Sequence, residues 1–373
     1  MSLHEEAGAR QLLTLPGEFP MRRNGVLRQP TIAYETWGNL NDAGNNAILL
    51  FTGLSPSAHA ASSAKDPSPG WWEEMLGSQR PIDTDRFFVI CVNSLGSCFG
   101  STGPASHIPS RKATYNIDYP VLSLEDIANS AIPVLEHLGI ERLFGVVGCS
   151  MGGMTALAFS VLHSNRTDRL ISVSSAARAA PFAIALRSLQ REMVRRDPDW
   201  QAGRYTDAGP ISGMRLARKL GMISYRSAAE WAQRFGRERV AAERVSNDAF
   251  CIDFEVESYL EAHANKFTGD FDANCYLFLS RAMDLFDVAD YGGSVASGVA
   301  RAGLREALII GVESDILFPL GQQQELADAL VQAGCDVQFD RLPSIQGHDS
   351  FLVDMDRFRP VIGNWLATRQ GDA

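Results

Sequence analysis

The chain has 373 residues, of which 45% are hydrophobic and 21% charged, and a formal net charge of −10. This length accommodates one large α/β domain with a substantial insertion, or two domains. The negative charge argues against nucleic acid or an anionic membrane as the main partner, and no run reaches the roughly 18 apolar residues of a spanning helix. The N-terminal segment has no apolar core typical of a signal peptide. We therefore expect a cytoplasmic protein that acts on small molecules.

The six cysteines are scattered along the sequence and form no CxxC pair. Such scattering is typical of reduced thiols and not of a disulfide framework or a zinc site. No GxxxxGK or HExxH motif occurs either. We therefore predict no metal site and no permanently bound cofactor.

Short runs rich in β-branched and aromatic residues recur along the chain, with helical patterns between them. Their continuous apolar character predicts strands that are buried on both faces of a sheet. The predicted strands are 31–37, 47–53, 86–94, 143–148, 170–176, 307–312 and 336–342. Helices are predicted at 124–139, where Ser123 is a candidate N-cap and Gly139 the stop, at 321–334 and at 358–369. This alternation predicts a mostly parallel, doubly wound sheet.

The sequence changes in character between residues 182 and 300. Runs such as IALRSLQREMVRRDPDW are amphipathic and helix-like, and convincing strands disappear. We therefore predict a helical lid at 182–300, inserted into a core domain formed by 1–181 and 301–373. Insertions of this kind are commonly active-site lids.

The segment FGVVGCSMGGMTAL places Ser150 between a predicted strand and a predicted helix. Residues 148–152 fit the pattern G-x-S-x-G, and the strand–turn–helix context is the one expected of a nucleophile elbow. The glycines allow a sharp turn, and the N-terminus of the following helix favours a developing negative charge. The alternative is a glycine-rich turn without chemistry.

Two further residues complete a candidate catalytic triad. Asp315 follows the sixth predicted strand and His348 the seventh, and the order serine, acid, histidine is that of the α/β-hydrolase fold. We therefore predict Ser150 as the nucleophile, His348 as its base and Asp315 as the acid that orients the base. The rival bases, in loops near the same edge, are His59 and His107.

An acyl oxyanion needs two hydrogen-bond donors. One expected donor is the N–H of Met151, directly after the candidate nucleophile. The other is expected from the loop that begins at Gly53-Leu54-Ser55-Pro56, and we predict the N–H of Leu54. The alternative is that this loop only connects two elements.

The chain resembles the homoserine O-acyltransferase family, whose members use acyl-CoA and have the α/β-hydrolase fold. The resemblance rests on GCSMGGMTAL, on PGWW at 69–72, on GHDSFLVD and on the triad order, and it covers nearly the whole chain. It implies ping-pong transfer, in which Ser150 takes the acyl group from a CoA thioester and an amino-acid hydroxyl then takes it from the enzyme. It also implies a homodimer through the lid helices, for which the apolar run LFLSRAM offers a face.

In that family, an arginine of the lid and the aspartate after the histidine hold the amino-acid acceptor. The matching residues here are Arg218, in GMRLARKLG, and Asp349. A zwitterion needs a guanidinium for its carboxylate and a carboxylate for its ammonium group. The alternatives are a solvated helix residue for Arg218 and a helix cap for Asp349.

Two departures from the acetyl-transferring members of the family bear on the substrates. Arg187 stands where those members typically carry a glutamate, and an added cation suits an acyl group with its own carboxylate, such as succinyl. A solvent-facing Arg187 would have no such role. The loop 53–56 reads GLSP where homoserine acetyltransferases usually read GLTG, and its proline removes a donor and stiffens the loop. A stiffer loop that narrows the acceptor site would favour serine over homoserine, although the one extra methylene of homoserine changes the free energy of discrimination by only about 1–3 kcal/mol.

These two departures resemble the serine O-succinyltransferase branch of the family. The expected reaction converts succinyl-CoA and L-serine into O-succinylserine and CoA, in cysteine biosynthesis. The alternatives left open are homoserine O-succinyl- or O-acetyltransfer in methionine biosynthesis, a serine hydrolase, and a non-catalytic binding protein on the same scaffold.

Overall fold

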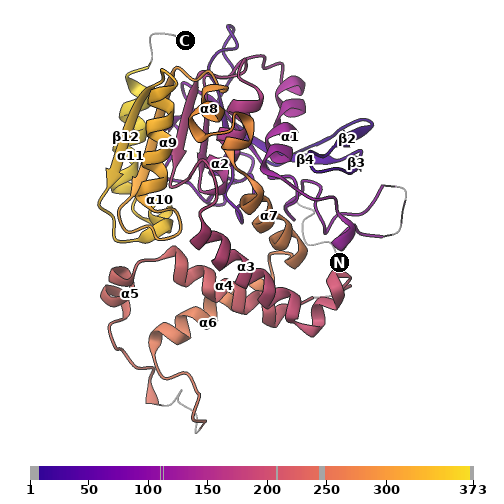
Figure 1. The fold of residues 1–373 in the computed structure, drawn as a ribbon, viewed down its shortest axis with the longest axis vertical. Coiled ribbons are helices and arrows are strands. Elements are labelled where there is room, and N and C mark those ends of the chain that lie inside the picture. Colours follow the sequence, from indigo (N-terminus) through magenta and orange to yellow (C-terminus); the bar gives the residue numbers. More distant parts are fainter. Residues whose placement is uncertain (1–7, 110, 112, 207–208, 243–247, 370–373) are drawn as a thin grey trace.

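The computed structural model describes residues 8–109, 111, 113–206, 209–242 and 248–369 of the chain. Within these residues, helices flank an eight-stranded sheet, and a separate layer of helices lies beyond one edge of it (Figure 1). The strands of the sheet are β1 (Gln11–Thr14), β4 (Thr31–Trp37), β5 (Ala47–Phe51), β8 (Phe88–Val92), β9 (Gly145–Cys149), β10 (Arg169–Val173), β11 (Glu306–Val312) and β12 (Asp336–Leu342). Two small sheets pair β2 (Glu18–Pro20) with β3 (Val26–Arg28) and β6 (Leu76–Gly77) with β7 (Ile82–Asp83).

The large sheet has the order β1-β4-β8-β5-β9-β10-β11-β12. Every pair from β8 to β12 is parallel, whereas β4 runs antiparallel to β8 and β1 antiparallel to β4. All residues of β5, β9 and β10 are buried, as their continuous apolar sequences predict. The predicted α/β-hydrolase fold, with its mostly parallel sheet, is therefore confirmed.

Successive residues of each central strand point to opposite faces of the sheet, where they belong to two separate hydrophobic cores. In β5, for example, Leu49 packs into one core and Ile48 into the other. The first core is covered by α1 (Leu124–His137), α2 (Met151–Leu162), α8 (Val295–Ala300) and α9 (Leu320–Gln332). The second core is covered by α11 (Met355–Ala367), by the short α10 (Ser350–Val353) and by the loop around Trp72. Helix α1 begins at a capping box in which Ser123 and Asp126 bind each other's backbone N–H groups, as the N-cap prediction requires.

The short strands β1, β2, β3, β6 and β7 were not predicted. Each has at most four residues, and their alternating or exposed side chains leave no continuous apolar run. Such pieces form because a neighbouring strand offers free backbone groups, as β4 does for β1. Their existence depends on the sheet more than on local sequence.

The predicted lid region is mainly helical in its described part, with turns and an isolated bridge between Arg239 and Phe254 connecting its helices. It comprises α3 (Pro181–Arg196), α4 (Ile211–Tyr225), α5 (Ala228–Phe235), α6 (Glu255–Thr268) and α7 (Ala273–Leu285), together with the short 3-10 helices η2 (Pro198–Gly203) and η4 (Val288–Tyr291). Helices α3, α4 and α6 form the layer that stands off the sheet, and α7 leads back toward it (Figure 1). Helix α8 already packs against α2 and α9 of the core. The lid therefore leaves the core after β10 and has returned to it before β11.

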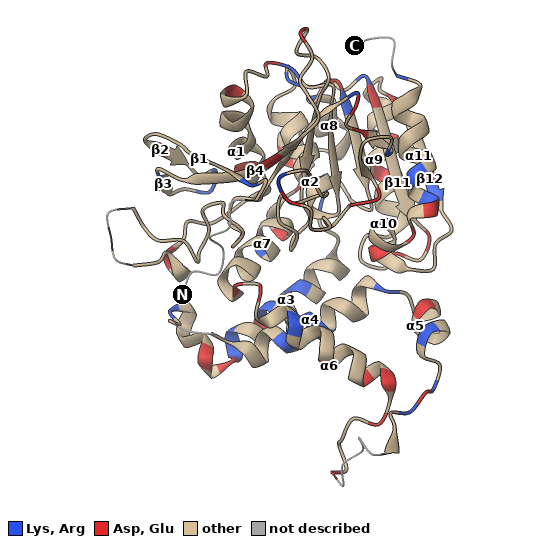
Figure 2. Ribbon diagram, turned by 180° about the vertical axis from the view of Figure 1, so that it is seen from behind, with Lys and Arg blue, Asp and Glu red and all other residues tan. Residues whose placement is uncertain are grey.

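Lys and Arg residues are frequent along α3 and α4 (Figure 2). Among the described helices, none combines the length and the apolar character that crossing a membrane requires.

Candidate active site

Ser150 lies in a strained turn between β9 and α2. Its backbone has φ 55° and ψ −123°, a region that residues other than glycine rarely occupy. A Cβ atom at Gly148 would lie 2.1 Å from the carbonyl oxygen of Gly152, and one at Gly152 would lie 2.3 Å from the carbonyl oxygen of Phe51. The two glycines of the motif are therefore required by close backbone contacts, and the turn lifts the serine hydroxyl off the end of the strand.

The structure brings the three predicted triad side chains into one hydrogen-bonded chain. Nε2 of His348 lies 2.7 Å from Oγ of Ser150, and Nδ1 of His348 lies 2.7 Å from Oδ2 of Asp315. Asp315 and His348 are buried, whereas Ser150 is partly accessible. This is the geometry in which an imidazole can accept a serine proton while a carboxylate fixes its orientation.

The surroundings of His348 hold the ring in place and set its basicity. Oδ1 of Asp315 accepts the backbone N–H groups of Leu317 and Phe318, each at 2.8 Å, and the Phe318 ring stacks on the imidazole at 5.1 Å. Burial alone lowers the pKa of His348, but the charge and the hydrogen bond of Asp315 outweigh it, so that the pKa is raised. The imidazolium that forms during proton transfer is thereby stabilised.

The loop that carries His348 is held from both the core and the lid. Nε1 of Trp72, in the PGWW segment, donates to the carbonyl oxygen of Phe351 at 2.9 Å. From the lid, Nη1 of Arg226 donates to Oε1 of Gln346 at 2.9 Å, and the Ser227 hydroxyl donates to the carbonyl oxygen of Ile345. The base is therefore positioned by the sheet and by the lid together.

The two predicted oxyanion donors, the N–H groups of Met151 and Leu54, belong to two chain segments that are in contact near Gly152 and Phe51. The close approach of Gly152 to the carbonyl oxygen of Phe51 sets the first turn of α2 against the end of β5, where the loop to Leu54 begins. Met151 is the first residue of α2, so its N–H has no partner inside the helix. Within the loop, the Pro56 ring lies 3.6 Å from the position that a Cβ of Gly53 would take. The GLSP segment is thus a compact turn beside the nucleophile.

Arg218 and Asp349, the candidate acceptor-binding residues, approach each other from the lid and the core. The charge of Arg218 acts on the Asp349 carboxyl group, where burial raises the pKa and the charges of Arg226, His348 and Arg218 oppose the rise. Arg218 lies over the Phe267 ring at 4.5 Å, and its buried Nε has no hydrogen-bond partner in the described part of the chain. Nε of Arg226 lies 3.3 Å from Oδ2 of Asp349. Asp349 is thus paired with Arg226 and also lies within the electrostatic influence of Arg218.

Arg187 is buried and does not point to solvent, the alternative that its position on a lid helix left open. Its side chain is 5% exposed, and its Nε lies 2.6 Å from Oδ1 of Asp284 on α7. Neither Nη1 nor Nη2 has a hydrogen-bond partner among the described residues. The positive charge of Arg187 acts to lower the pKa of His348, the candidate base. A buried arginine with two unused Nη groups is suited to bind an anionic group.

Comparisons with known proteins show the family to which the chain belongs. The sequence profile of the alpha/beta hydrolase fold family matches residues 46–354. A serine O-succinyltransferase from Litchfieldella anticariensis is 55% identical over 361 residues, which cover 96% of this chain and 98% of that protein. The chain belongs to the homoserine/serine O-acyltransferase family.

Solved structures of similar shape include an acyltransferase and an esterase. The homoserine O-acetyltransferase from Bacillus anthracis has a TM-score of 0.89 and 25% identity, covering 97% of this chain and 98% of its own. Esterase E22 has a TM-score of 0.87 and 27% identity, covering 96% of this chain and 99% of its own. The present enzyme is an O-acyltransferase, and its fold also serves hydrolysis in a relative.

The rival histidines have other partners in this acyltransferase. Nδ1 of His59 lies 2.9 Å from Oε2 of Glu35, and its Nε2 lies 2.9 Å from the carbonyl oxygen of Ser68. Both ring nitrogens of His59 are therefore occupied. His107 forms an isolated β-bridge with Thr114 in the loop before α1. Neither histidine is hydrogen-bonded to Ser150, which contacts His348 instead.

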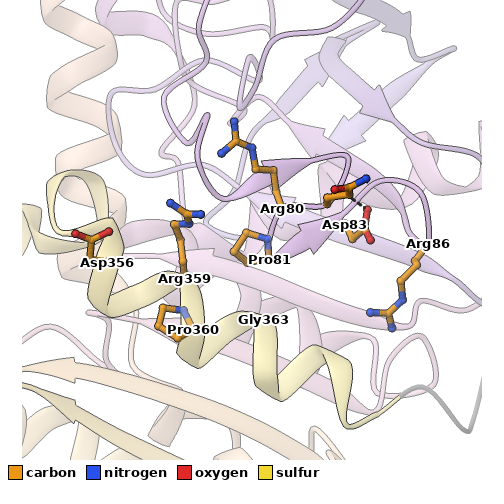
Figure 3. A pocket seen from close by; sticks show the side chains of 9 residues that line it. Arg80, Pro81, Asp83, Arg86, Asp356, Arg359, Pro360 and Gly363 are labelled. Carbon is orange, nitrogen blue, oxygen red and sulfur yellow. Dashed lines mark hydrogen bonds between the residues drawn. The ribbon is translucent and has the colours of Figure 1, made fainter.

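A hollow lies away from the triad, at the opposite end of the parallel strands. It has a volume of about 560 Å³ and is lined by side chains from the segment before β8 and from α11, including Arg80, Arg86, Asp356 and Arg359 (Figure 3). That segment enters β8 at its amino end, whereas the triad lies at the carboxyl ends of the strands. The hollow is therefore separate from the candidate active site.

Several residues of the site were not anticipated from the sequence. Arg226 reaches Asp349, the Tyr225 ring lies tilted beside the His348 ring with centroids 5.8 Å apart, and Asp284 binds Arg187. A spacing of four between Arg187 and Arg191 would have signalled a shared helix face. Nothing in the local sequence connects that face with Asp284, which is 97 residues away.

The six cysteines are free thiols, four of them buried. No cluster of three or more His, Cys, Asp or Glu side chains in the described ranges could hold a metal ion.

Proposed function

We propose that this O-acyltransferase transfers a succinyl group from succinyl-CoA to the hydroxyl group of L-serine, through an acyl-enzyme on Ser150. The observation that carries the proposal is the buried Arg187, whose Nη1 and Nη2 are unpaired in the described structure while its Nε binds Asp284. Buried Nη groups without an acceptor are costly, and the free carboxylate of a succinyl group would supply that acceptor. The name of the 55% identical relative, serine O-succinyltransferase, supports the same substrates.

In the first half-reaction, His348 takes the proton of Ser150 through Nε2, and Oγ attacks the thioester carbonyl carbon. The N–H groups of Leu54 and Met151 stabilise the oxyanion of the tetrahedral intermediate. The carbon–sulfur bond then breaks, His348 returns the proton to the CoA sulfur, and Ser150 carries the acyl group as an ester. Asp315 holds the imidazole in the tautomer that makes both transfers possible.

In the second half-reaction, the amino-acid hydroxyl replaces CoA. Arg218 binds the carboxylate of the acceptor, and the Asp349 carboxylate binds its ammonium group. His348 removes the hydroxyl proton, the oxygen attacks the ester carbon, and the proton passes to Oγ of Ser150 as the ester bond to the enzyme breaks. The products are an O-acyl amino acid and the free serine enzyme.

The compact GLSP turn supports serine as the acceptor. Pro56 has no N–H to donate and packs against Gly53, so the wall beside the nucleophile is stiff. Homoserine differs from serine by one methylene, so the difference in transition-state free energy between the two acceptors should be about 1–3 kcal/mol. Serine would place the enzyme in cysteine synthesis, and homoserine in methionine synthesis. Homoserine O-succinyl- or O-acetyltransfer is the second candidate, favoured by the structural likeness to a homoserine O-acetyltransferase.

A plain hydrolase is the third candidate, and the likeness to esterase E22 favours it. The triad and the oxyanion donors would serve water as readily as a serine hydroxyl. Transfer depends on excluding water from the acyl-enzyme, which is the part the lid would play. A hydrolase would release CoA at the same rate whether or not an amino acid is present.

Initial rates with four substrate pairs test the proposal. Acetyl-CoA or succinyl-CoA is combined with L-serine or L-homoserine, free CoA thiol is followed, and each product is identified by mass. We expect succinyl transfer to serine to dominate. Dominant homoserine acylation would retain the mechanism and refute the acceptor, and CoA release that ignores both amino acids would refute transfer.

Two predictions concern the whole enzyme, namely a cytoplasmic location, expected from its composition and N-terminal segment, and a homodimer built through the lid, implied by the family resemblance. The run LFLSRAM is unsuited to the dimer contact, because Leu277, Leu279 and Met283 are buried within the subunit. Large apolar side chains are instead exposed on α3 and α4, at Phe182, Leu189, Leu216 and Ile223. These side chains are the better candidates for a contact between two copies, which light scattering on the purified enzyme would test.

A further inference from the structure

A buried charge network connects helices α3 and α7 of the lid. Arg187 and Arg191 lie one turn apart on α3, and Ser280 and Asp284 lie one turn apart on α7. Oδ1 of Asp284 is 2.6 Å from Nε of Arg187, and Oδ2 is 2.6 Å from Nη2 of Arg191. Nη1 of Arg191 donates to the Ser280 hydroxyl at 2.9 Å. The Asp284 side chain is 1% exposed and that of Arg191 13%, so the carboxylate at the centre of the network is closed to solvent.

The network leaves the two Nη groups of Arg187 without a hydrogen-bond partner among the described residues. Asp284 binds Arg187 at Nε only, so the two Nη groups at the far end of the planar fork remain available. Arg191, by contrast, has both of its Nη atoms engaged, by Asp284 and Ser280. Two arginines and one aspartate also leave one positive charge unbalanced. A single additional carboxylate would complete both the hydrogen bonding and the charge.

An unrestrained arginine would not keep this arrangement. Its long side chain has many rotamers, and fixing them costs free energy each time a ligand binds. The ion pair with Asp284 fixes Nε of Arg187 and so restricts the positions that its two Nη groups can take.

We propose that Asp284, supported by Arg191 and Ser280, is the positioning residue that presents Arg187 to the terminal carboxylate of the acyl donor. Asp284 thereby sets the preference for acyl-CoA substrates that carry an ω-carboxylate over uncharged ones. The inference rests on the proposed role of Arg187 in donor choice. A purely structural role for Asp284, as a counter-charge that holds α3 against α7, would affect all donors alike.

Substitution of Asp284 by asparagine separates these roles. In Asp284→Asn we expect kcat/KM for succinyl-CoA to fall about 10- to 100-fold, chiefly through KM, while kcat/KM for acetyl-CoA stays within about twofold. Asp284→Glu keeps the charge and should recover part of the lost preference. The control is Arg281→Gln, at an exposed position of the same helix, which should match the wild type with both donors. Equal losses with both donors in Asp284→Asn would overturn the proposal.

A second variant covers the case in which Asp284→Asn does not fold. Arg191→Gln removes one partner of Asp284 and leaves Arg187 in place, so we expect a smaller loss that is again confined to succinyl-CoA. A donor preference equal to that of the wild type would overturn the proposal.

The parent proposal is tested separately with Arg187→Met. If the wild type does not prefer succinyl-CoA, or if Arg187→Met keeps that preference, the proposed donor is wrong. If Arg187→Met loses the preference and Asp284→Asn keeps it, only the role of Asp284 is wrong.

Discussion

The catalytic edge of the sheet and the lid beyond it place their functional groups by different means. At the edge, Ser150, Asp315 and His348 each follow a parallel strand, and the pairing of β9 to β12 brings them to one side of the core. In the lid, Arg187 acquires its position by packing against a helix distant in sequence. The positions of the triad side chains therefore depend on the order of the strands in the sheet. The positions of the candidate substrate-binding arginines depend on how the side chains of neighbouring helices pack.

This division has a functional consequence. Changes at the sheet edge should abolish acyl transfer with every substrate, because all substrates share the same bond-making steps. Changes in the lid should alter which donor or acceptor is used and leave the chemistry largely intact. The following predictions test that division, beginning with the largest expected effect.

Ser150→Ala should lower kcat by about a millionfold with either acyl-CoA, since no other group can form the acyl-enzyme. Mass spectrometry of the enzyme after mixing with succinyl-CoA should show an adduct on Ser150 in the wild type and none in the variant. A covalent acyl group found on another residue would contradict the assignment.

Arg187→Met should lower kcat/KM for succinyl-CoA by about 100- to 1000-fold, because the succinyl carboxylate loses its buried partner. The value for acetyl-CoA should change little, since an acetyl group has no carboxylate to bind. Parallel losses with the two donors would show that Arg187 supports the site as a whole and does not select the donor.

Asp349→Ala should raise the KM for the amino-acid acceptor about 10- to 100-fold, because the ammonium group loses a charged partner. The rate of enzyme acylation by the donor, measured in a single turnover without acceptor, should remain close to that of the wild type. Collapse of this first step would mean that Asp349 supports His348 instead of binding the acceptor.

Replacing GLSP by GLTG, through Ser55→Thr combined with Pro56→Gly, should shift the ratio of kcat/KM for serine over homoserine toward homoserine by about tenfold, within the range of one methylene. The expected cause is that the loop 53–56 becomes more flexible beside Ser150 and accommodates the longer acceptor. The donor preference should not change, and this serves as the internal control. A ratio that stays constant would remove the loop from acceptor choice.

The pH dependence should show the smallest change. Activity requires neutral His348, so kcat/KM should fall as pH drops through a pKa raised above the ordinary value of about 6.5. Arg187 opposes that rise, so in Arg187→Met the acid limb, measured with acetyl-CoA, should move to higher pH. An acid limb that stays at the wild-type pH would mean that the charge of Arg187 does not act on His348.

Much of the catalytic edge could be predicted from the sequence. The seven predicted strands all occur, and β4 and β12 have the predicted bounds, because continuous apolar runs bury both faces of a parallel sheet. Ser150, Asp315 and His348 follow from the same rule, since parallel strands end at a common edge. The distances between the three side chains still required the structure.

The lid could be predicted only as helices. A spacing of four residues puts Arg187 and Arg191 on one face of a helix, but it does not say which helix that face meets. The structure shows that the Arg187 guanidinium is buried against Asp284. It also shows that Arg226 belongs to the site, because Arg226 contacts Asp349.

The sequence by itself therefore determined the class of fold, the order of the triad and the residue types available for acyl transfer. These depend on local patterns, apolar runs and a glycine-rich turn, that act over a few residues. Only the tertiary structure decided which charged groups of the lid are buried and which of their donors remain free. Whether an ion can be buried is a property of the pair that it forms, and here the partners are 97 residues apart in the chain.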